Sequence, residues 1–157
     1  MVISEHSTEG RIAWVMAAFF MLVCALAVVA ALPDGNSVRY VFATVCHQDP
    51  SRCHRLAGRP FGLCVRCWWI YLGLAVGHPG FAGFRVPEKW AIRFVAGAAG
   101  LLLADVALEM LGAYDNLKGT RAVTGFLFGV ACSWFILRGL TEWLGTQKTN
   151  KIDYESN

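Results

Sequence analysis

Residues 12–32 read IAWVMAAFFMLVCALAVVAAL, a run of 21 residues without a charged side chain. A helix of this length covers the roughly 30 Å hydrocarbon core of a bilayer at about 1.5 Å per residue. The run lacks the small-residue pattern at which signal peptides are cleaved, which favours a retained membrane helix. The whole chain agrees, because 56% of its 157 residues are hydrophobic and only 16% are charged. This balance predicts a single integral membrane domain over residues 1–157.

Three further segments are apolar enough to form membrane helices: 67–84, 94–114 and 122–140. Together with residues 12–32 they predict an all-α integral membrane four-helix bundle whose two termini lie on the same side of the membrane. Residues 36–47 carry apolar side chains at helical spacing, which predicts a short interfacial helix after the first span. Residues 141–157 form a polar tail.

The loop between the first two spans has an unusual composition. Residues 46–67 read CHQDPSRCHRLAGRPFGLCVRC, with four cysteines, two histidines and four arginines. A CxxC pair with two further cysteines nearby is typical of a zinc site, because thiolates are strong ligands for this ion. The neighbouring His47 and His54 could replace a ligand or support one. The predicted metal ligands are Cys46, Cys53, Cys64 and Cys67.

The alternating direction of the four spans brings distant polar residues to the side of this loop. Asp105 and Glu109 are four residues apart on one helical face of the third span. An unpaired carboxylate inside a membrane is costly, so we expect Arg66 or Arg121 to lie within ion-pair reach of Asp105. The predicted pocket combines candidate catalytic residues, His47, Arg66, Asp105 and Arg121, with candidate cofactor-binding residues, Gln48 and Asn116.

The cysteines allow more than one interpretation. In the first they bind a metal ion, for which zinc is the most suitable. In the second the Cys64-Val-Arg-Cys67 dithiol exchanges electrons with a quinone, as in four-helix membrane enzymes that carry a CxxC pair at the mouth of a helix; Arg66 would then lower a thiol pKa. In the third the cysteines only staple or pack the loop.

The motifs together resemble an uncharacterised prokaryotic membrane family, domain of unknown function 2085. The resemblance covers about residues 39–129 and rests on RYVFATVCHQDPSRC, on LCVRCWWIYLG and on the distal Asp105, Asn116, Arg121 and Gly125. Two positions depart from the family pattern, because Cys53 stands where serine is usual and Glu109 where glutamine is usual. The resemblance implies that Cys46, Cys64 and Cys67 are the core set of ligands.

Three function classes follow for a zinc site that faces a polar pocket. The protein could be a metal-dependent membrane enzyme acting on an amphiphile, a thiol–quinone oxidoreductase, or a non-catalytic subunit of a membrane complex with a structural zinc. The expected partners are the lipid bilayer, a small-molecule or lipid ligand and, in the third class, a membrane-complex partner. The net charge of +3 is small and dispersed, which gives nucleic-acid binding no support.

The location expected for this chain is a prokaryotic inner or plasma membrane. Each side of the predicted bundle carries seven lysine and arginine residues, so the positive-inside rule alone does not orient it. If the arginines of the cysteine-rich loop serve a site, they carry no information on orientation. The remaining charges then place the termini in the cytoplasm.

Overall fold

The computed structural model describes residues 2–84, 86–112 and 117–155, and the side chains of residues 8–146 within these ranges. The described chain is mostly α-helical. Its elements in chain order are α1 (Val2–Val29), α2 (Asn36–Phe42), a 3₁₀ turn (Pro50–Arg52), β1 (Cys53–Leu56), β2 (Arg59–Cys64), α3 (Val65–Gly83), α4 (Glu88–Met110) and α5 (Lys118–Glu155).

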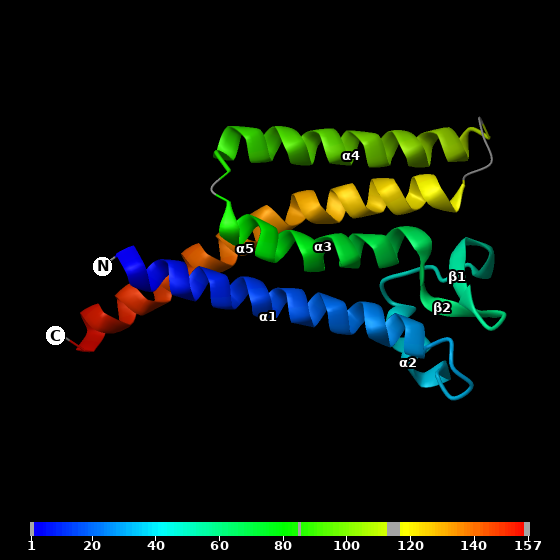
Figure 1. Ribbon diagram of the computed structural model, residues 1–157, viewed down its shortest axis with the longest axis horizontal. Coiled ribbons are helices and arrows are strands. Elements are labelled where there is room, and N and C mark those ends of the chain that lie inside the picture. The colour runs from blue at the N-terminus through cyan, green and yellow to red at the C-terminus, as the bar shows by residue number, and fades with distance from the viewer. Residues whose placement is uncertain (1, 85, 113–116, 156–157) are drawn as a thin grey trace.

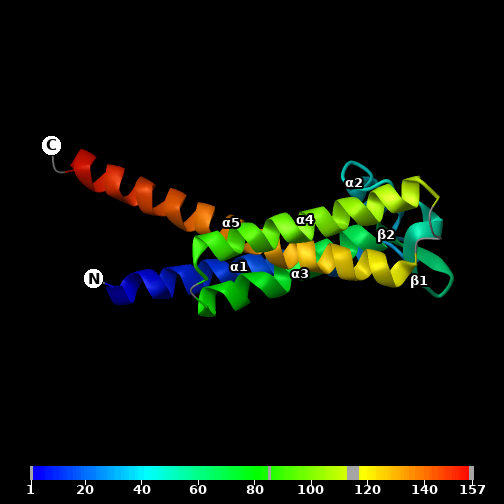
Figure 2. The same cartoon turned by 90° about the horizontal axis from the view of Figure 1, so that it is seen from above.

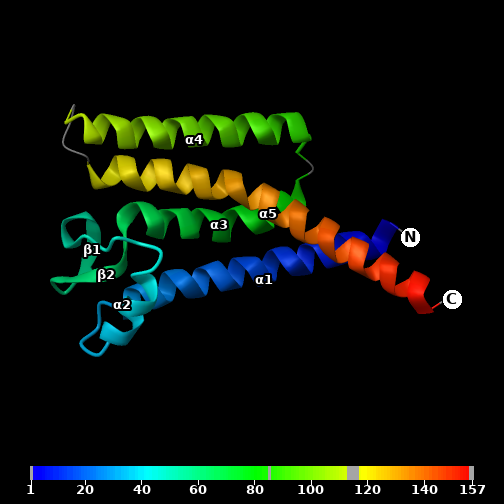
Figure 3. The same cartoon turned by 180° about the vertical axis from the view of Figure 1, so that it is seen from behind.

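The four long helices run side by side (Figure 1). Views from the front and from behind both place α3 between α1 and the first half of α5, with α4 on the outer flank of α5 (Figures 1 and 3). The contacts agree, because α3 packs mainly against α5 and α1, and α4 packs mainly against α5. The last part of α5 diverges from the other helices (Figure 2). The start of α1 and the end of α5 lie at one end of the molecule, and the β1–β2 hairpin lies at the other.

Three helices of the described chain are long and apolar enough to cross a membrane: Thr8–Val29, Glu88–Met110 and Lys118–Thr146. Many of their large apolar side chains are exposed, as expected for side chains that face lipid; Trp14, Leu103 and Met110 are examples. The sequence-based prediction of an integral membrane protein agrees with these helices. The remaining predicted span, 67–84, corresponds to α3, which is not among the three.

Glycines allow α3 and α5 to pack closely. A Cβ atom added at Gly125 would lie 2.6 Å from the carbonyl oxygen of Arg66, and one added at Gly129 would collide with the carbonyl of Ile70. From the opposite side, a Cβ atom at Gly73 would collide with the carbonyl of Phe126. These glycines therefore bring the backbones of α3 and α5 together, which is the usual role of small residues between membrane helices.

The cysteine-rich segment contains a feature that the all-α prediction did not include. Residues 53–64 form an antiparallel hairpin in which Leu56 pairs with Arg59 around Ala57 and Gly58. Both turn residues have positive φ, +48° and +82°, as a tight two-residue hairpin turn requires. Alanine rarely adopts this conformation, so the sequence carried no strong turn signal. The short helix expected over 36–47 is present as α2, Asn36–Phe42.

Helix boundaries differ from the expected ones. α3 begins two residues before its expected start and continues through Pro79 as far as Gly83. α5 continues through most of the polar tail and ends at Glu155. The tail beyond Trp143 is therefore helical over most of its length.

Candidate metal centre and charged network

Three cysteines from three different elements meet beside the hairpin. Cys46 follows α2, Cys64 ends β2, and Cys67 lies in the first turn of α3. Their sulfur atoms all lie within 4.8 Å of one another. The backbone N–H of Cys64 also donates a hydrogen bond to the Cys46 sulfur at 3.2 Å. We call these three residues the cysteine cluster; all three thiols are free in the structure.

The surroundings of the cysteine cluster are largely apolar. Cys46 is buried with Ala27, Phe42 and Leu63, and the half-buried Cys64 and Cys67 pack against this group. Hydrogen bonds from the Cys64 and Cys67 thiols lower the pKa of the Cys46 thiol far below its usual value of 9.0. The three sulfur atoms thus stabilise a thiolate at Cys46, and a thiolate is the form of cysteine that binds metals or attacks disulfides.

Cys53, the fourth predicted ligand, is not a member of the cluster. It is fully buried and lies directly across the hairpin from Cys64. Burial is the main cause that raises the pKa of its thiol to about 11. Because paired residues on adjacent antiparallel strands have neighbouring side chains, Cys53 is the nearest further thiol to the cluster along the hairpin.

The two histidines of the loop also stand apart from the cluster. The Trp69 indole N–H donates a hydrogen bond of 3.1 Å to Nε2 of His54. His54 therefore accepts through Nε2, and burial lowers its pKa. His47 has an exposed side chain, and no hydrogen bond or ion pair among the described residues joins it to the cluster.

A second cluster, of charged residues, lies between α3, α4 and α5. Arg66 of α3 donates to the Asp105 carboxylate of α4, and its guanidinium lies 3.6 Å from Glu109. Arg121 of α5 donates to Glu109, and Arg52 of the 3₁₀ turn lies 3.2 Å from the same carboxylate. We call these five residues the charged network. Asp105 and Arg121 are both only 6% exposed, so the network is largely buried.

The expectation that Arg66 or Arg121 pairs with Asp105 is confirmed, with Arg66 as the partner. The hydroxyl of Thr124 lies 3.4 Å from the same carboxylate and donates to the Thr120 carbonyl at 2.9 Å. The prediction that Asp105 faces the helices and not lipid is also confirmed, because its side chain is 5% exposed.

The cysteine cluster and the charged network lie on different faces of α3. Cys67 packs toward α1 and α2, whereas its neighbour Arg66 reaches α4. Successive residues of a helix point about 100° apart, which separates these two side chains. The sequence analysis expected one pocket that joins the cysteines to Arg66, Asp105 and Arg121. The structure instead brings together two groups of residues, one on each face.

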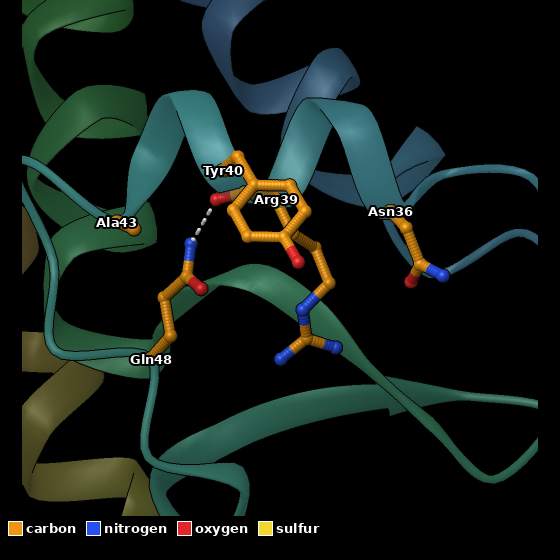
Figure 4. Close-up of a pocket in the computed structure, with 5 residues that line it drawn as sticks. All are labelled: Asn36, Arg39, Tyr40, Ala43 and Gln48. Atoms are coloured by element: carbon orange, nitrogen blue, oxygen red, sulfur yellow. Dashed lines mark hydrogen bonds between the residues drawn. The ribbon is translucent and has the colours of Figure 1, made fainter.

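Gln48, predicted to bind a cofactor, holds the chain in place. Its side-chain amide donates to the carbonyls of Arg39 at 2.7 Å and Gly62 at 2.9 Å, which fixes α2 on the hairpin (Figure 4). These bonds support the unusual positive φ of Gln48, +52°. Asn116, the other residue predicted to bind a cofactor, lies outside the described residues.

Sequence reasoning gave too little weight to Glu109 and Arg52. Glu109 lies within ion-pair distance of three arginines, although the family pattern suggested that its charge was unimportant. Arg52 connects the 3₁₀ turn to α4 across a large separation in sequence. The spacing of Asp105 and Glu109 was the signal for Glu109, but nothing in the sequence indicated that Arg52 reaches α4.

Comparison with known proteins places these residues within one family. The family of predicted membrane proteins with domain of unknown function 2085 matches residues 46–135, more than half of the chain. The chain belongs to this family. The region matched to domain 2085 begins at Cys46 and contains both the cysteine cluster and the charged network.

One relative shows the extent of the similarity. The uncharacterized protein MJ1492 of Methanocaldococcus jannaschii is 29% identical over 103 residues, which cover 62% of this chain and 64% of the relative. The chain therefore spans less than two thirds of that relative's length. No solved structure matches this member of the domain 2085 family.

Proposed function

We propose that this protein is a zinc-binding integral membrane protein in which Cys46, Cys64 and Cys67 hold the ion. The observation that carries the proposal is the approach of three sulfur atoms from three separate elements to within 4.8 Å. Zinc–sulfur bonds of about 2.3 Å in a tetrahedral site imply sulfur–sulfur separations of roughly 3.8 Å. The sulfur atoms of the cluster, which lie within 4.8 Å of one another, would need to move only slightly closer together to bind zinc. Three thiolates are also a donor set that suits zinc better than magnesium or calcium.

We propose α3 as the fourth membrane-crossing helix. It has 19 residues and lies between α1 and α5, which are both apolar enough to cross a membrane. It carries two polar side chains, Arg66 and His78, and both of them face other helices. Neighbouring helices can thus shield α3 from lipid. In this arrangement the hairpin lies on the outer side of a prokaryotic plasma membrane and the termini lie in the cytoplasm.

A zinc held by three cysteines would serve two purposes. It would join the end of α2, the end of β2 and the start of α3, and so fix the hairpin on the helices. It would also leave one coordination position for water or a substrate, which is the arrangement of catalytic zinc sites. When bound, zinc supplies Lewis acidity and lowers the pKa of a bound water. These properties support a metal-dependent membrane enzyme that acts on an amphiphile entering from the bilayer.

The charged network is best explained as a clamp between helices. Arg66, Asp105 and Arg121 were candidates for catalysis, but Arg66 points toward α4 whereas Cys67 packs toward α1 and α2. Their ion pairs instead join α3, α4 and α5 at the end of the molecule that carries the hairpin.

Thiol chemistry is the second candidate, favoured by the same short distances. The Cys46 sulfur lies within reach of both other thiols. Oxidation of two of these thiols would form one S–S bond and release two electrons and two protons. A quinone in the bilayer could accept both and become a quinol. This reaction and zinc binding exclude one another at the same sulfur atoms.

Metal analysis of detergent-purified protein, combined with a count of free thiols, separates the two candidates. We expect close to one zinc per chain, and loss of most of it in Cys64→Ser. Cys132→Ser is the matched control, because it removes a thiol from α5 that lies outside the cluster. A folded, metal-free protein with a disulfide among Cys46, Cys64 and Cys67 would refute the zinc proposal and support the thiol–quinone oxidoreductase.

A further inference from the structure

The short helix α2 carries three distinct faces. Val38 and Phe42 face inward and pack on α1 and the hairpin. Val41 and Val45 are exposed, by 69% and 58%. The third face bears Asn36, Arg39, Tyr40 and Ala43, which recur at helical spacing and line a pocket of about 330 Å³ together with Gln48 (Figure 4). We call this the α2 pocket.

The polar groups of the α2 pocket include donors that the protein does not use. Arg39 donates one hydrogen bond, of 3.3 Å, to the carbonyl of Pro60, which leaves its other N–H groups open to the pocket. The amide of Asn36 and the hydroxyl of Tyr40 have no hydrogen-bond partner among the described residues, and Tyr40 is 78% exposed. The pocket therefore offers a guanidinium, an amide and a hydroxyl to one ligand.

The arginines near this pocket differ from those of the charged network. Arg52, Arg66 and Arg121 each have a carboxylate within ion-pair distance. By contrast, no carboxylate of the described residues lies within 4 Å of Arg39, or of Arg55 and Arg59 beside it in the hairpin. Pro60, which accepts from Arg39, follows Arg59 and pairs with Arg55. Asp49, next to Gln48, pairs with Arg52 instead. These three arginines therefore have no ion-pair partner among the described residues.

The exposed apolar residues place the α2 pocket at the boundary of the membrane. α2 follows directly after the apolar span of α1, at the end of the helices (Figure 1). Val41 and Val45 are exposed beside the pocket, and Leu56 is 43% exposed at the tip of the hairpin. Exposed apolar side chains beside cationic ones, here Arg39 on α2 and Arg55 and Arg59 on the hairpin, are typical of elements that lie among lipid headgroups.

We propose that the α2 pocket binds the phosphate of an anionic membrane lipid. The Arg39 guanidinium would hold the phosphate through paired N–H donors, which suit phosphate geometry. Asn36 and Tyr40 would donate to the remaining oxygens or to the headgroup, while the acyl chains lie along Val41 and Val45. Gln48 positions Arg39, because its amide bonds to the Arg39 carbonyl. This site uses no residue of the cysteine cluster, so it does not depend on the proposed zinc.

Native mass spectrometry of the full chain released from detergent tests this proposal. The protein is titrated with phosphatidylglycerol and with phosphatidylcholine of the same acyl chains. We expect tighter binding of phosphatidylglycerol, and an affinity for it that is lower by about tenfold or more in Arg39→Gln, since charge-assisted hydrogen bonds are lost. Arg93→Gln is the matched control, because it removes one charge near the start of α4 at the other end of the molecule, and should bind the lipid as the wild type does.

Two further measurements keep the proposal open to refutation. If Arg39→Gln fails to fold, as judged by helicity and elution volume, the double variant Arg55→Gln/Arg59→Gln replaces it, because both side chains are exposed. That variant should weaken phosphatidylglycerol binding by about fivefold or more. Inorganic phosphate, added at the same concentration as phosphatidylglycerol, should not displace that lipid from the wild-type protein. Equal binding of the two lipids, unchanged binding by the folded variants, or displacement by inorganic phosphate would each overturn the assignment to an anionic lipid.

Discussion

The Arg66 guanidinium donates a hydrogen bond to the Asp105 carboxylate and so ties α3 to α4, two helices that otherwise barely touch because α5 lies beside both. Each charge of this pair lies at the helix end that disfavours it. Arg66 is in the first turn of α3, where the helix dipole is positive, and Asp105 is in the last two turns of α4, where the dipole is negative. Arg121 at the start of α5 and Glu109 at the end of α4 repeat this arrangement. The network therefore depends on its own pairing.

Replacing Asp105 by asparagine should destabilise the protein but leave its metal content unchanged. The change removes the carboxylate from a largely buried pair, which typically costs about 3–5 kcal/mol. The cysteine cluster lies on the other face of α3, so zinc binding should persist. Thermal unfolding in detergent and metal analysis measure the two quantities.

Glu88→Gln is the control for Asp105→Asn. Glu88 is an exposed acid in the first turn of α4, and its loss should cost less than about 1 kcal/mol. Equal unfolding temperatures for the two variants would contradict the proposal that the charged network joins α3, α4 and α5. Loss of zinc from folded Asp105→Asn would instead show that the charged network and the cysteine cluster form one site.

Arg52 is predicted to hold the 3₁₀ turn and the start of β1 on α4. Its side chain is 52% exposed, so Arg52→Ala should lower global stability by only about 1 kcal/mol or less. The local stability of the 3₁₀ turn and β1 should fall by more than the global stability, because Arg52 provides the ion pair from this turn to Glu109. Hydrogen exchange should become faster for the backbone amides of residues 51–56. Arg59→Ala, in the same hairpin but with no carboxylate partner in the described part of the chain, should leave these rates unchanged; equal acceleration in both variants would refute the role of Arg52.

Much of the fold follows from simple patterns in the sequence. The uncharged run at 12–32 indicates a membrane helix by its length alone, and the spacing of Val38 and Phe42 indicates the short helix that follows it. The hairpin could not be predicted in the same way, because its turn uses Ala57 in a conformation that alanine seldom adopts. Helix ends were also uncertain, since α5 continues into a polar segment where no hydrophobic pattern marks it.

The site was predictable in part, and the limit is a physical one. The direction of each span determines which polar residues share an end of the molecule, and this was enough to expect Arg66 or Arg121 near Asp105; Arg66 forms the ion pair. It does not determine the rotation of each helix about its own axis. The neighbours that Cys67 and Arg66 each face depend on that rotation, which is set by the close packing of α3 on α5 at Gly125 and Gly129.

Substitution of Gly129 by alanine should therefore destabilise the protein. Its Cβ atom would collide with the carbonyl of Ile70, and overpacking of this kind typically costs about 1–3 kcal/mol. Gly139→Ala on the same helix is the matched control, because a Cβ atom there meets nothing within 4 Å. That change should be neutral or stabilising by up to about 1 kcal/mol, since alanine is the better helix former. Thermal unfolding in detergent compares them, and equal effects would argue against the close packing of α3 on α5.

The number of thiolates at the cysteine cluster can be decided with Cys53→Ser. The sulfur of Cys53 is not among the three that converge, so this variant should retain close to one zinc per chain, unlike Cys64→Ser. Serine is also the residue that the family pattern suggests at this position, so the fold should tolerate it.

The fourth coordination position can be tested with cobalt in place of zinc. Cobalt bound by three thiolates and a water should change its visible spectrum when imidazole is added, and Cys53→Ser should respond in the same way. A wild-type spectrum that is insensitive to imidazole, together with loss of metal from Cys53→Ser, would mean that Cys53 rotates across the hairpin to complete a closed site beside Cys64. A closed site of four thiolates has no position for a substrate, so that result would exclude zinc-dependent catalysis at this cluster and favour a zinc that only fixes the hairpin on α1 and α3.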